Sequence, residues 1–435
     1  MKKDQVIDVF WFRRDLRLND NKGLYRALQG GRQVLPLFIL DRDILDHLPR
    51  NDHRVSFIYR ALRDIETSLR ARTKGLMIKR GSPAEVFQQL LDSYSIGAVY
   101  SNLDHEPSGI ERDRQVERYL RSKGVDFHQE LDHLVMNKND VLKGDGTPYH
   151  VYTPYGKRWK TLLTGDHLNR YPSETLLARF VPATNNPIPR LHDIGFSTSS
   201  ITAPPPDINK QLITQYHLKR DVPAKEGTTR LGVHLRFGTV SIRQLVKKAM
   251  EWNQTFLNEL IWREFYAMIL WHHPYVVNNS FKTVYDRIEW QNNEDDFQLW
   301  KEGRTGYPMV DAGMRQLKES GYMHNRLRMI TASFLSKHLL IDWRWGAAWF
   351  AEKLFDYELS SNNGGWQWSA GTGCDAAPYF RIFNPLSQQQ KFDPDARFIR
   401  QWVAGFDTPE YPQPMTDHAY ARERCLKVYR KALNS

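Results

Sequence analysis

Short apolar runs alternate with amphipathic segments through the first 130 residues of the chain. The apolar runs cover residues 6–12, 34–40, 76–79 and 98–101. This alternation is typical of a parallel, doubly wound sheet with helices on both faces. Segment 83–94 shows the helical part, because its apolar residues recur at helical spacing from Val86 to Leu91 and Pro83 suits a first helical turn. We therefore predict an α/β fold, with a Rossmann-like domain over residues 1–130.

The remainder of the chain has two different patterns. Residues 131–207 are weakly periodic and contain proline clusters at 185–189 and 203–207, which favour extended linker backbone. Beyond residue 208 the strand signals fade and helical patterns dominate. Eleven of the thirteen tryptophans lie between Trp252 and Trp402. We predict an interdomain connector over 131–207 and an all-α domain over 208–435 that carries the aromatic chemistry.

Composition narrows the class of protein. A chain of 435 residues can bury two cores, and its net charge of +11 favours a polyanionic partner such as nucleic acid, although charge alone also fits a basic protein without one. Cys374 and Cys425 are too few for a disulfide framework, a zinc cage or a four-thiolate cluster. No run of about eighteen apolar residues is present. We expect a cytoplasmic monomer without a bound metal or membrane contact.

Residues 362–385 place four glycines among two tryptophans, a tyrosine and two phenylalanines. Glycine packs nothing and costs entropy, so a segment that only fills a core does not need so many beside its largest rings. The pattern predicts that a flat, bulky ligand lies against this backbone, while an aromatic core with glycine-rich connections is the plainer alternative.

This string, with segments 258–266, 306–315 and 322–333, resembles the flavin-binding core of the photolyase and cryptochrome family, and is closest to class I cyclobutane pyrimidine dimer photolyases. The resemblance implies non-covalent FAD in the helical domain, active as FADH⁻. It also implies light-driven repair of UV-damaged DNA, in which photoexcited FADH⁻ passes an electron to a flipped-out dimer and the electron then returns. Segments 10–20 and 104–107 resemble the family's antenna domain.

Four residues of segment 258–266 share one helical face at i, i+3, i+4 and i+7: Glu259, Trp262, Arg263 and Tyr266. A salt-bridged surface would account for Glu259 with Arg263, but it accounts poorly for Trp262. The resemblance implies that Glu259 hydrogen-bonds the damaged pyrimidines and that Trp262 packs on the dimer. That role requires Glu259 to donate a proton, which burial of a carboxylic acid favours.

A second face joins Asn325, Arg328 and Met329, and an ordinary polar helix side is the alternative. The resemblance implies that Asn325 reaches both flavin and lesion, that Met329 lies against the lesion, and that Arg328 pairs with Asp356 near the isoalloxazine ring. It places the Asn362 amide at flavin N5, where an amide both donates and accepts.

Residues 228–232 precede a helical pattern, and their hydroxyl and N–H groups suit the FAD pyrophosphate. An ordinary helix cap would have the same sequence pattern. Many relatives have Ser where this chain has Gly232. The implied flavin contacts are Tyr216, Thr228, Thr229, Arg230, Leu231, Gly232, Tyr357 and Glu358. The further implied DNA contacts are Arg220, Arg326, Trp368 and Gln388, with Arg220 and Arg326 as candidates for binding phosphate.

The resemblance also implies an electron relay through Trp366, Trp343 and Trp290, although isolated tryptophans are usually core residues. Glu106 matches a position that contacts a second, antenna chromophore. Folate, deazaflavin and FMN all remain open for that site, and so does the absence of any antenna.

Three related functions compete with dimer repair. A cryptochrome-type blue-light photoreceptor is opposed by Asn362, by the set Glu259, Trp262 and Asn325, and by the short stretch that follows the glycine-rich motif. A six-four photolyase needs a histidine pair at the lesion, where this chain has Asn325. A DASH-type photolyase that prefers single strands stays open.

Overall fold

The computed structural model describes residues 5–183 and 188–434. They form two compact units that interleave along the chain. The first unit comprises the described parts of Met1–Asn137, Leu163–Asp207 and Leu231–Lys248, and the second comprises Lys138–Leu162, Ile208–Arg230 and the rest from Ala249. The predicted domain boundaries, which concern independent folding, stay predictions.

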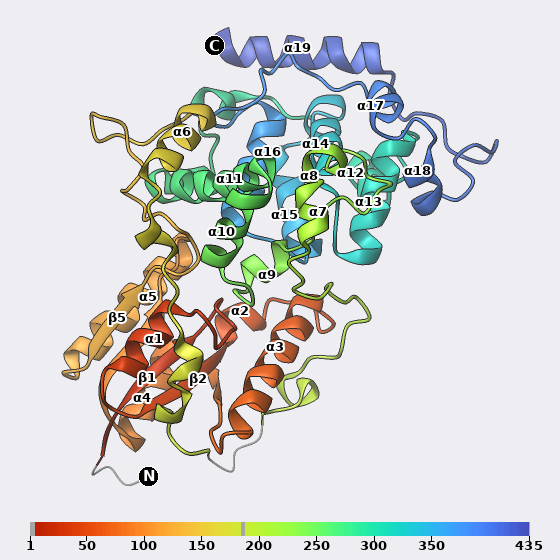
Figure 1. Cartoon of the computed structure of the whole chain (residues 1–435). Coiled ribbons are helices and arrows are strands. Elements are labelled where there is room, and N and C mark those ends of the chain that lie inside the picture. The colour runs from red at the N-terminus through yellow and green to blue at the C-terminus, as the bar shows by residue number, and fades with distance from the viewer. Residues whose placement is uncertain (1–4, 184–187, 435) are drawn as a thin grey trace. The chain divides into compact units, whose positions relative to one another are not determined.

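The first unit is built on a parallel sheet, drawn in red to orange in Figure 1. In the described residues the sheet has five strands in the order β3-β2-β1-β4-β5, so the chain moves outward in one direction and then in the other. The strands are β1 Val6–Phe12, β2 Val34–Asp41, β3 Met77–Gly81, β4 Ser95–Asn102 and β5 Asp126–Glu130. The doubly wound α/β prediction is confirmed.

Helices of the first unit lie between successive strands: α1 Lys22–Gln29, α2 Arg42–Leu45, α3 His53–Arg70, α4 Pro83–Ser93 and α5 Pro107–Ser122. Helix α9, Gly232–Arg236, belongs to the same unit but follows the sheet in the chain. Alternate side chains of β1, at Ile7, Val9 and Trp11, face the apolar side chains of α4 and α5 in one buried cluster. Ser82 and Glu85 form a capping box at the start of α4.

The edge strand β5 was not predicted as a strand. Its sequence, Asp126–Glu130, lacks an apolar run because its side chains are half-buried or exposed. Backbone pairing with β4, from Ala98 opposite Asp126 to Asn102 opposite Glu130, defines the strand instead.

A buried ion network holds Leu231–Lys248 in the first unit. Asp132 accepts from Arg17 and, at 2.8 Å, from Arg243, which also pairs with Asp20 at 3.0 Å. Burial by itself raises the pKa of Asp132, but the two guanidinium groups outweigh it and hold that pKa well below its usual range. Sequence alone does not show these charge pairs, because they join residues that are distant along the chain.

The second unit consists of helices, drawn in yellow, green and blue in Figure 1. They are α6 Tyr152–Leu162, α7 Lys210–Thr214, α8 Tyr216–Lys219, α11 Gln254–His272, α12 Glu294–Glu302, α13 Pro308–Ser320, α14 Asn325–Ser333, the π-helix η7 Phe334–His338, α15 Trp343–Lys353, α16 Leu359–Ala370, α17 Pro385–Phe392, α18 Arg397–Trp402 and α19 His418–Asn434. Helix α10, Ile242–Trp252, runs from the first unit into the second. The all-α prediction for the later part of the chain is confirmed.

Helix α6 lies within residues 131–207, the range predicted as an interdomain connector. It packs on α11, where the Trp159 indole N–H donates to Glu264 Oε2 at 2.7 Å and Lys160 donates to Asn258 Oδ1 at 2.8 Å. Its helical signal was weak, so the partners on α11 define its place. The proline cluster at 185–189 falls largely outside the described residues.

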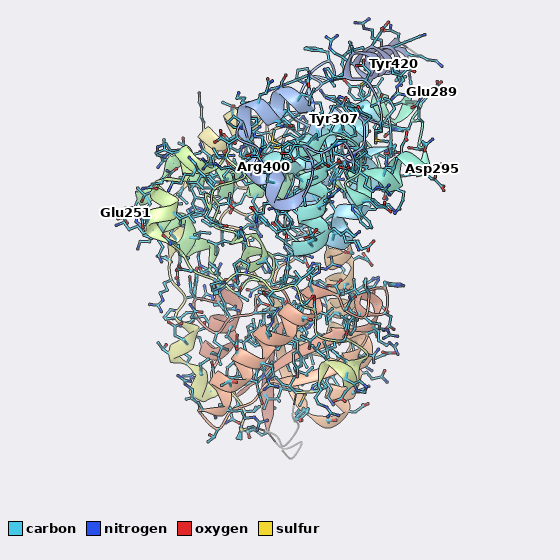
Figure 2. All side chains as sticks on the ribbon, turned by 90° about the vertical axis from the view of Figure 1, so that its right-hand side faces the viewer. Glu251, Glu289, Asp295, Tyr307, Arg400 and Tyr420 are labelled. Carbon is cyan, nitrogen blue, oxygen red and sulfur yellow. The ribbon has the colours of Figure 1, made fainter. Side chains whose placement is uncertain are left out.

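Helix α19 packs through the buried side chains of Cys425 and Tyr429. Its exposed Lys431 pairs with Glu289 at 2.7 Å, and Figure 2 labels Glu289 at the surface. Both cysteines are free and buried. Across the described ranges, no helix has the length and apolar character needed to cross a bilayer.

Candidate functional site

Two glycines allow three helices of the second unit to pack closely. A Cβ on Gly364 of α16 would lie 2.1 Å from Cδ1 of the Tyr266 ring on α11. A Cβ on Gly346 of α15 would lie 2.0 Å from the Trp366 ring on α16. Neither position accepts a larger residue unless the facing ring or its helix shifts. The glycine-rich sequence is thus explained in part by helix packing.

A cavity of about 380 Å³ opens beside this packing. Gly365 has a different environment from Gly364, because a Cβ there would meet nothing within 4 Å. Its backbone therefore faces open space in the cavity wall. The residues that line the cavity are Arg220, Glu259, Trp262, Arg263, Tyr266, Asn325, Arg328, Met329, Ala332, Phe350, Leu354, Asp356, Tyr357, Glu358, Ser361, Asn362, Gly365, Trp366, Trp368 and Ser369.

Most of the predicted site residues meet at this cavity. Both helical stripes supply lining residues: all four members on α11, and Asn325, Arg328 and Met329 on α14. The predicted residues outside its lining are Trp290, Trp343, Tyr216, Thr228, Thr229, Arg230, Arg326 and Gln388 in the second unit, and Glu106, Leu231 and Gly232 in the first. Their roles stay predictions.

Glu259 is held by Arg220, which donates from Nη1 to Glu259 Oε1. Burial by itself lowers the pKa of Arg220, but Glu259 outweighs burial and raises it. The structure therefore shows Glu259 as an acceptor. For Glu259 to donate a proton to a substrate, this pair has to separate.

Arg326 is engaged in the same way. It donates to Asp221 Oδ1 at 2.6 Å, and its guanidinium lies 4.2 Å from the centre of the Phe392 ring. Both arginines predicted to bind phosphate thus have carboxylate partners, which DNA would have to displace.

The predicted Arg328–Asp356 pair is present. Arg328 Nη2 donates to both Asp356 oxygens, at 3.0 and 2.9 Å, and Nε donates to Met323 O at 2.8 Å. The guanidinium is fixed on two sides, although one nitrogen bridges both oxygens in place of the two-nitrogen fork. This geometry holds a positive charge at the cavity wall.

Tyr322 connects the cavity to the predicted pyrophosphate segment. Its hydroxyl lies 2.9 Å from Thr228 Oγ1, and the guanidinium groups of Arg230 and Arg328 lie 5.0 and 6.0 Å from its ring centre. Arg230 adopts a positive φ of 51°, uncommon for a residue other than glycine. Helix α9 begins at Gly232, where the sequence predicted a helix start.

Two further polar groups of the cavity wall are oriented by neighbours. Glu358 accepts from Arg263 at 3.0 Å and from Ser361 Oγ at 3.3 Å. Asn362 donates from Nδ2 to Ala347 O at 3.1 Å. An amide has two N–H groups and a carbonyl oxygen, so this bond uses only part of the capacity of Asn362.

The three relay tryptophans occupy one region of the helical core. Trp366 lines the cavity and its ring packs at Gly346, one helical turn beyond Trp343 on α15. Trp343 is buried, and Arg344 lies 4.8 Å above its ring. Trp290 is half-buried beside the segment that leads into α15, where Gln291 N donates to Leu340 O at 2.7 Å. Electron transfer between them stays a prediction.

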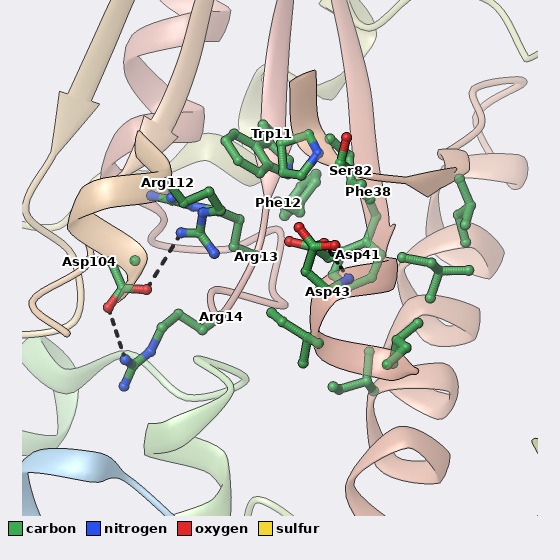
Figure 3. A pocket seen from close by; sticks show the side chains of 18 of the residues that line it. Trp11, Phe12, Arg13, Arg14, Phe38, Asp41, Asp43, Ser82, Asp104 and Arg112 are labelled. Carbon is green, nitrogen blue, oxygen red and sulfur yellow. Dashed lines mark hydrogen bonds and ion pairs between the residues drawn. The ribbon is translucent and has the colours of Figure 1, made fainter. Parts of the chain in front are cut away.

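The first unit has its own cavity of about 800 Å³. Phe38, Ile44 and other apolar side chains line one part of it, while Arg13 and Arg112 lie 4.8 and 5.3 Å from the centre of the Trp11 ring. Figure 3 shows these guanidinium groups beside Trp11, with Asp41 and Asp43 at another part of the wall.

The predicted antenna residue Glu106 lines this cavity and is buried. It accepts from Arg236 at 2.6 Å and from Arg14 at 3.2 Å. Burial raises the pKa of Glu106, but the two arginines outweigh burial and lower it, so the side chain is ionised. Arg14 also pairs with Asp104, as Figure 3 shows.

Sequence reasoning missed several cavity residues. Ser361, Gly365 and Ser369 lie on the cavity side of α16, Ser361 directly before the glycine-rich string and the other two within it, but no role was assigned to them. Their spacing of four residues places them on one helical face, a signal that the sequence carried. Tyr322 is not among the lining residues but contacts Thr228 and Arg328, and sequence reasoning assigned it no role either.

The residues present fit an FAD isoalloxazine ring in the second-unit cavity. The open backbone at Gly365 is flanked by Trp366, and the fixed Arg328 charge suits an anionic ring. The volume of the cavity lies in the range of about 300–1,000 Å³ typical of ligand pockets. Among residues 5–183 and 188–434, no group of three or more side chains that could hold a metal ion is found.

Comparison with known proteins agrees with this geometry. Residues 8–174 match the family described as DNA photolyase, and residues 256–409 match the FAD binding domain of DNA photolyase. Proteins named deoxyribodipyrimidine photo-lyase from Escherichia coli and Halobacterium salinarum are 37% and 35% identical, with 98% of this chain covered in each case and 98% and 99% of theirs. The chain belongs to the DNA photolyase and cryptochrome family.

Solved structures give the same family. A bacterial class III photolyase from Agrobacterium tumefaciens has a TM-score of 0.84 at 30% identity, over 100% of this chain and 99% of the other. An archaeal photolyase from Sulfolobus tokodaii, described with two FAD molecules, has a TM-score of 0.82 at 31% identity, over 98% and 100%. A Synechocystis cryptochrome at 24% identity, with a TM-score of 0.83 over 98% and 100%, bears on the fold alone.

A histidine caps the N-terminus of α14, and we expect it to make the site sensitive to acid. His324 accepts the Arg326 backbone N–H with Nδ1 at 3.1 Å, and burial lowers the pKa of His324 to about 4. A depressed histidine pKa gives stability that is complete above the usual value of about 6.5 and is lost as the pH falls toward 4. We expect flavin release, measured by flavin fluorescence, to increase as the pH falls through this window. His324→Asn, which caps the helix without titrating, is expected to reduce that increase.

The exposed His192 provides a matched control, since its side chain is 96% accessible. His192→Asn is expected to follow the wild-type curve. If His324→Asn also followed the wild-type curve, the cap would have no part in acid release.

Proposed function

We propose that this chain repairs cyclobutane pyrimidine dimers in DNA, using light and a bound FAD. The observation that carries the proposal is a single cavity whose wall joins Asn362, Arg328 and Trp366, suited to a flavin, with Glu259, Trp262 and Asn325, suited to a dimer. When bound, reduced FAD supplies the electron that light drives to the dimer. The family's deoxyribodipyrimidine photo-lyases support this enzyme class.

In this proposal the protein's own residues bind the flavin and the dimer and orient them. The Arg328 charge and the Asn362 amide hold the reduced, anionic flavin ring, while Trp262 and Trp368 receive the flipped-out dimer between aromatic faces. A dimer stacks and pairs poorly in the duplex, which lowers the cost of flipping; photolyases are an established example of base flipping. Glu259 turns from Arg220 to the dimer on binding, and Asn325 reaches both ligands.

The charge of +11 supports a DNA partner, since lysines and arginines that neutralise phosphates release counterions. The cavity in the first unit is our candidate for a second chromophore. Its size and its Trp11 wall suit an aromatic ring system, with folate, deazaflavin and FMN still open. A monomer in the cytoplasm, without a metal, remains our expectation.

The direct test is light-dependent repair of defined substrates. Oligonucleotides with one cyclobutane dimer or one six-four lesion, in single and double strands, are illuminated with the purified FAD-loaded protein. We expect the cyclobutane dimer alone to be split, and only in the light. Splitting of six-four lesions alone would contradict the proposal, as would flavin photochemistry without repair.

Two substitutions separate cofactor reduction from repair. The Trp343 indole N–H has no protein partner among the described residues, so Trp343→Phe keeps the ring and loses no such bond. Phenylalanine is harder to oxidise, so photoreduction of oxidised flavin is expected to slow severely. Repair by flavin reduced chemically is expected to persist.

Glu259→Ala gives the opposite pattern. It removes a hydrogen bond to the dimer, which is expected to lower the repair yield by as much as roughly 100-fold, the cost of losing one preorganised donor. Photoreduction is expected to stay at the wild-type rate. Equal loss of photoreduction in both variants would show that the two steps share one set of residues.

A further inference from the structure

One face of the Trp262 indole is covered by a residue from another helix. Tyr152 begins α6, and its ring stacks on the Trp262 indole with centroids 3.7 Å apart and 7° between the planes. Of this pair, Trp262 is among the described residues that line the cavity and Tyr152 is not. The tyrosine therefore covers one face of the indole, while Trp262 itself borders the cavity.

Tyr152 is itself fixed at both ends. Its hydroxyl donates to Asn258 O at 2.9 Å, and its backbone N–H donates to Asp375 Oδ2 at 3.0 Å. Burial, followed by the charge of Glu259, raises the pKa of Tyr152, so the hydroxyl remains a donor at any physiological pH. A ring held in this way is a firm support for a neighbour.

The other described ring contacts of Trp262 come from its own helix and meet it at an angle. Phe265 and Tyr266 both lie with centroids 5.5 Å away, at 85° and 34°. These contacts limit where the indole can move, but a face-to-face stack defines the plane of the ring. Helix α6, beside α11 in Figure 1, brings that stack from a part of the chain distant in sequence.

We propose that Tyr152 is a positioning residue for lesion recognition. Its ring holds the Trp262 plane so that the cavity-facing side of the indole is ordered before the dimer arrives. Ordering a side chain in advance removes part of the entropy cost of binding. The inference rests on the proposed function, in which Trp262 packs against the dimer.

The experiment compares three variants of the FAD-loaded protein. Tyr152→Leu removes the stack, Tyr152→Phe keeps it without the hydroxyl, and Lys160→Met removes the two α6–α11 hydrogen bonds of Lys160 while leaving the rings intact. For Tyr152→Leu we expect KM for dimer-containing DNA to rise about three- to tenfold, the range of an aromatic pair. Its flavin content, repair rate at saturating substrate and affinity for undamaged DNA are expected to match the wild type.

Tyr152→Phe is expected to restore the wild-type KM, and Lys160→Met to leave it unchanged. In a Trp262→Leu background, Tyr152→Leu is expected to have no further effect. Where Tyr152→Leu does not yield folded holoprotein, Tyr152→Met takes its place with the same expectations.

A wild-type KM in the variant that lacks the ring would overturn the inference. A rise in KM for Lys160→Met equal to that for Tyr152→Leu would also overturn it, because weaker docking of α6 alone would then explain the effect. The proposed function fails on a different result: a wild-type protein that neither prefers nor repairs dimer-containing DNA.

Discussion

Close packing of α11, α15 and α16 at two glycines is the constraint on which the site depends. Gly364 admits the Tyr266 ring against α16, and Gly346 admits the Trp366 ring against α15. Glycine in a helix costs about 1 kcal/mol relative to alanine, so these positions sacrifice local helix stability for contact between helices. The contact sets the distance between the wall that carries Trp262 and the wall that carries Asn362.

Charge at the cavity is arranged in pairs. Arg220 with Glu259, Arg263 with Glu358 and Arg328 with Asp356 each join a guanidinium to a carboxylate from another part of the second unit. The Arg263–Glu358 pair is the most buried of the three, so removing either partner there would leave an uncompensated buried charge. The pair at Glu259 differs in function from the others, because the proposed repair role requires it to open.

Local sequence patterns were enough to predict much of the site. Helical spacing was enough to join Glu259 with Trp262 and Asn325 with Arg328, and apolar runs were enough to locate four of the strands. What sequence could not give depends on contacts between distant segments. Strand β5 is defined by pairing with β4, and α6 is defined by its partners on α11. The family resemblance supplied the Arg328–Asp356 pair, but neither Arg220 as the partner of Glu259, nor Arg263 as the partner of Glu358, nor the stack of Tyr152 on Trp262 could be predicted from sequence.

The central claim is that the open backbone at Gly365 forms part of the flavin site. The most direct measurement is the flavin content of Gly365→Leu, with thermal unfolding measured alongside. Leucine raises helix propensity and its Cβ would meet no neighbour within 4 Å, so the account predicts a folded protein that has lost flavin and repair together. Gly144→Leu is the control, since Gly144 is exposed and also open. A Gly365→Leu protein with full flavin content and wild-type repair would contradict the account.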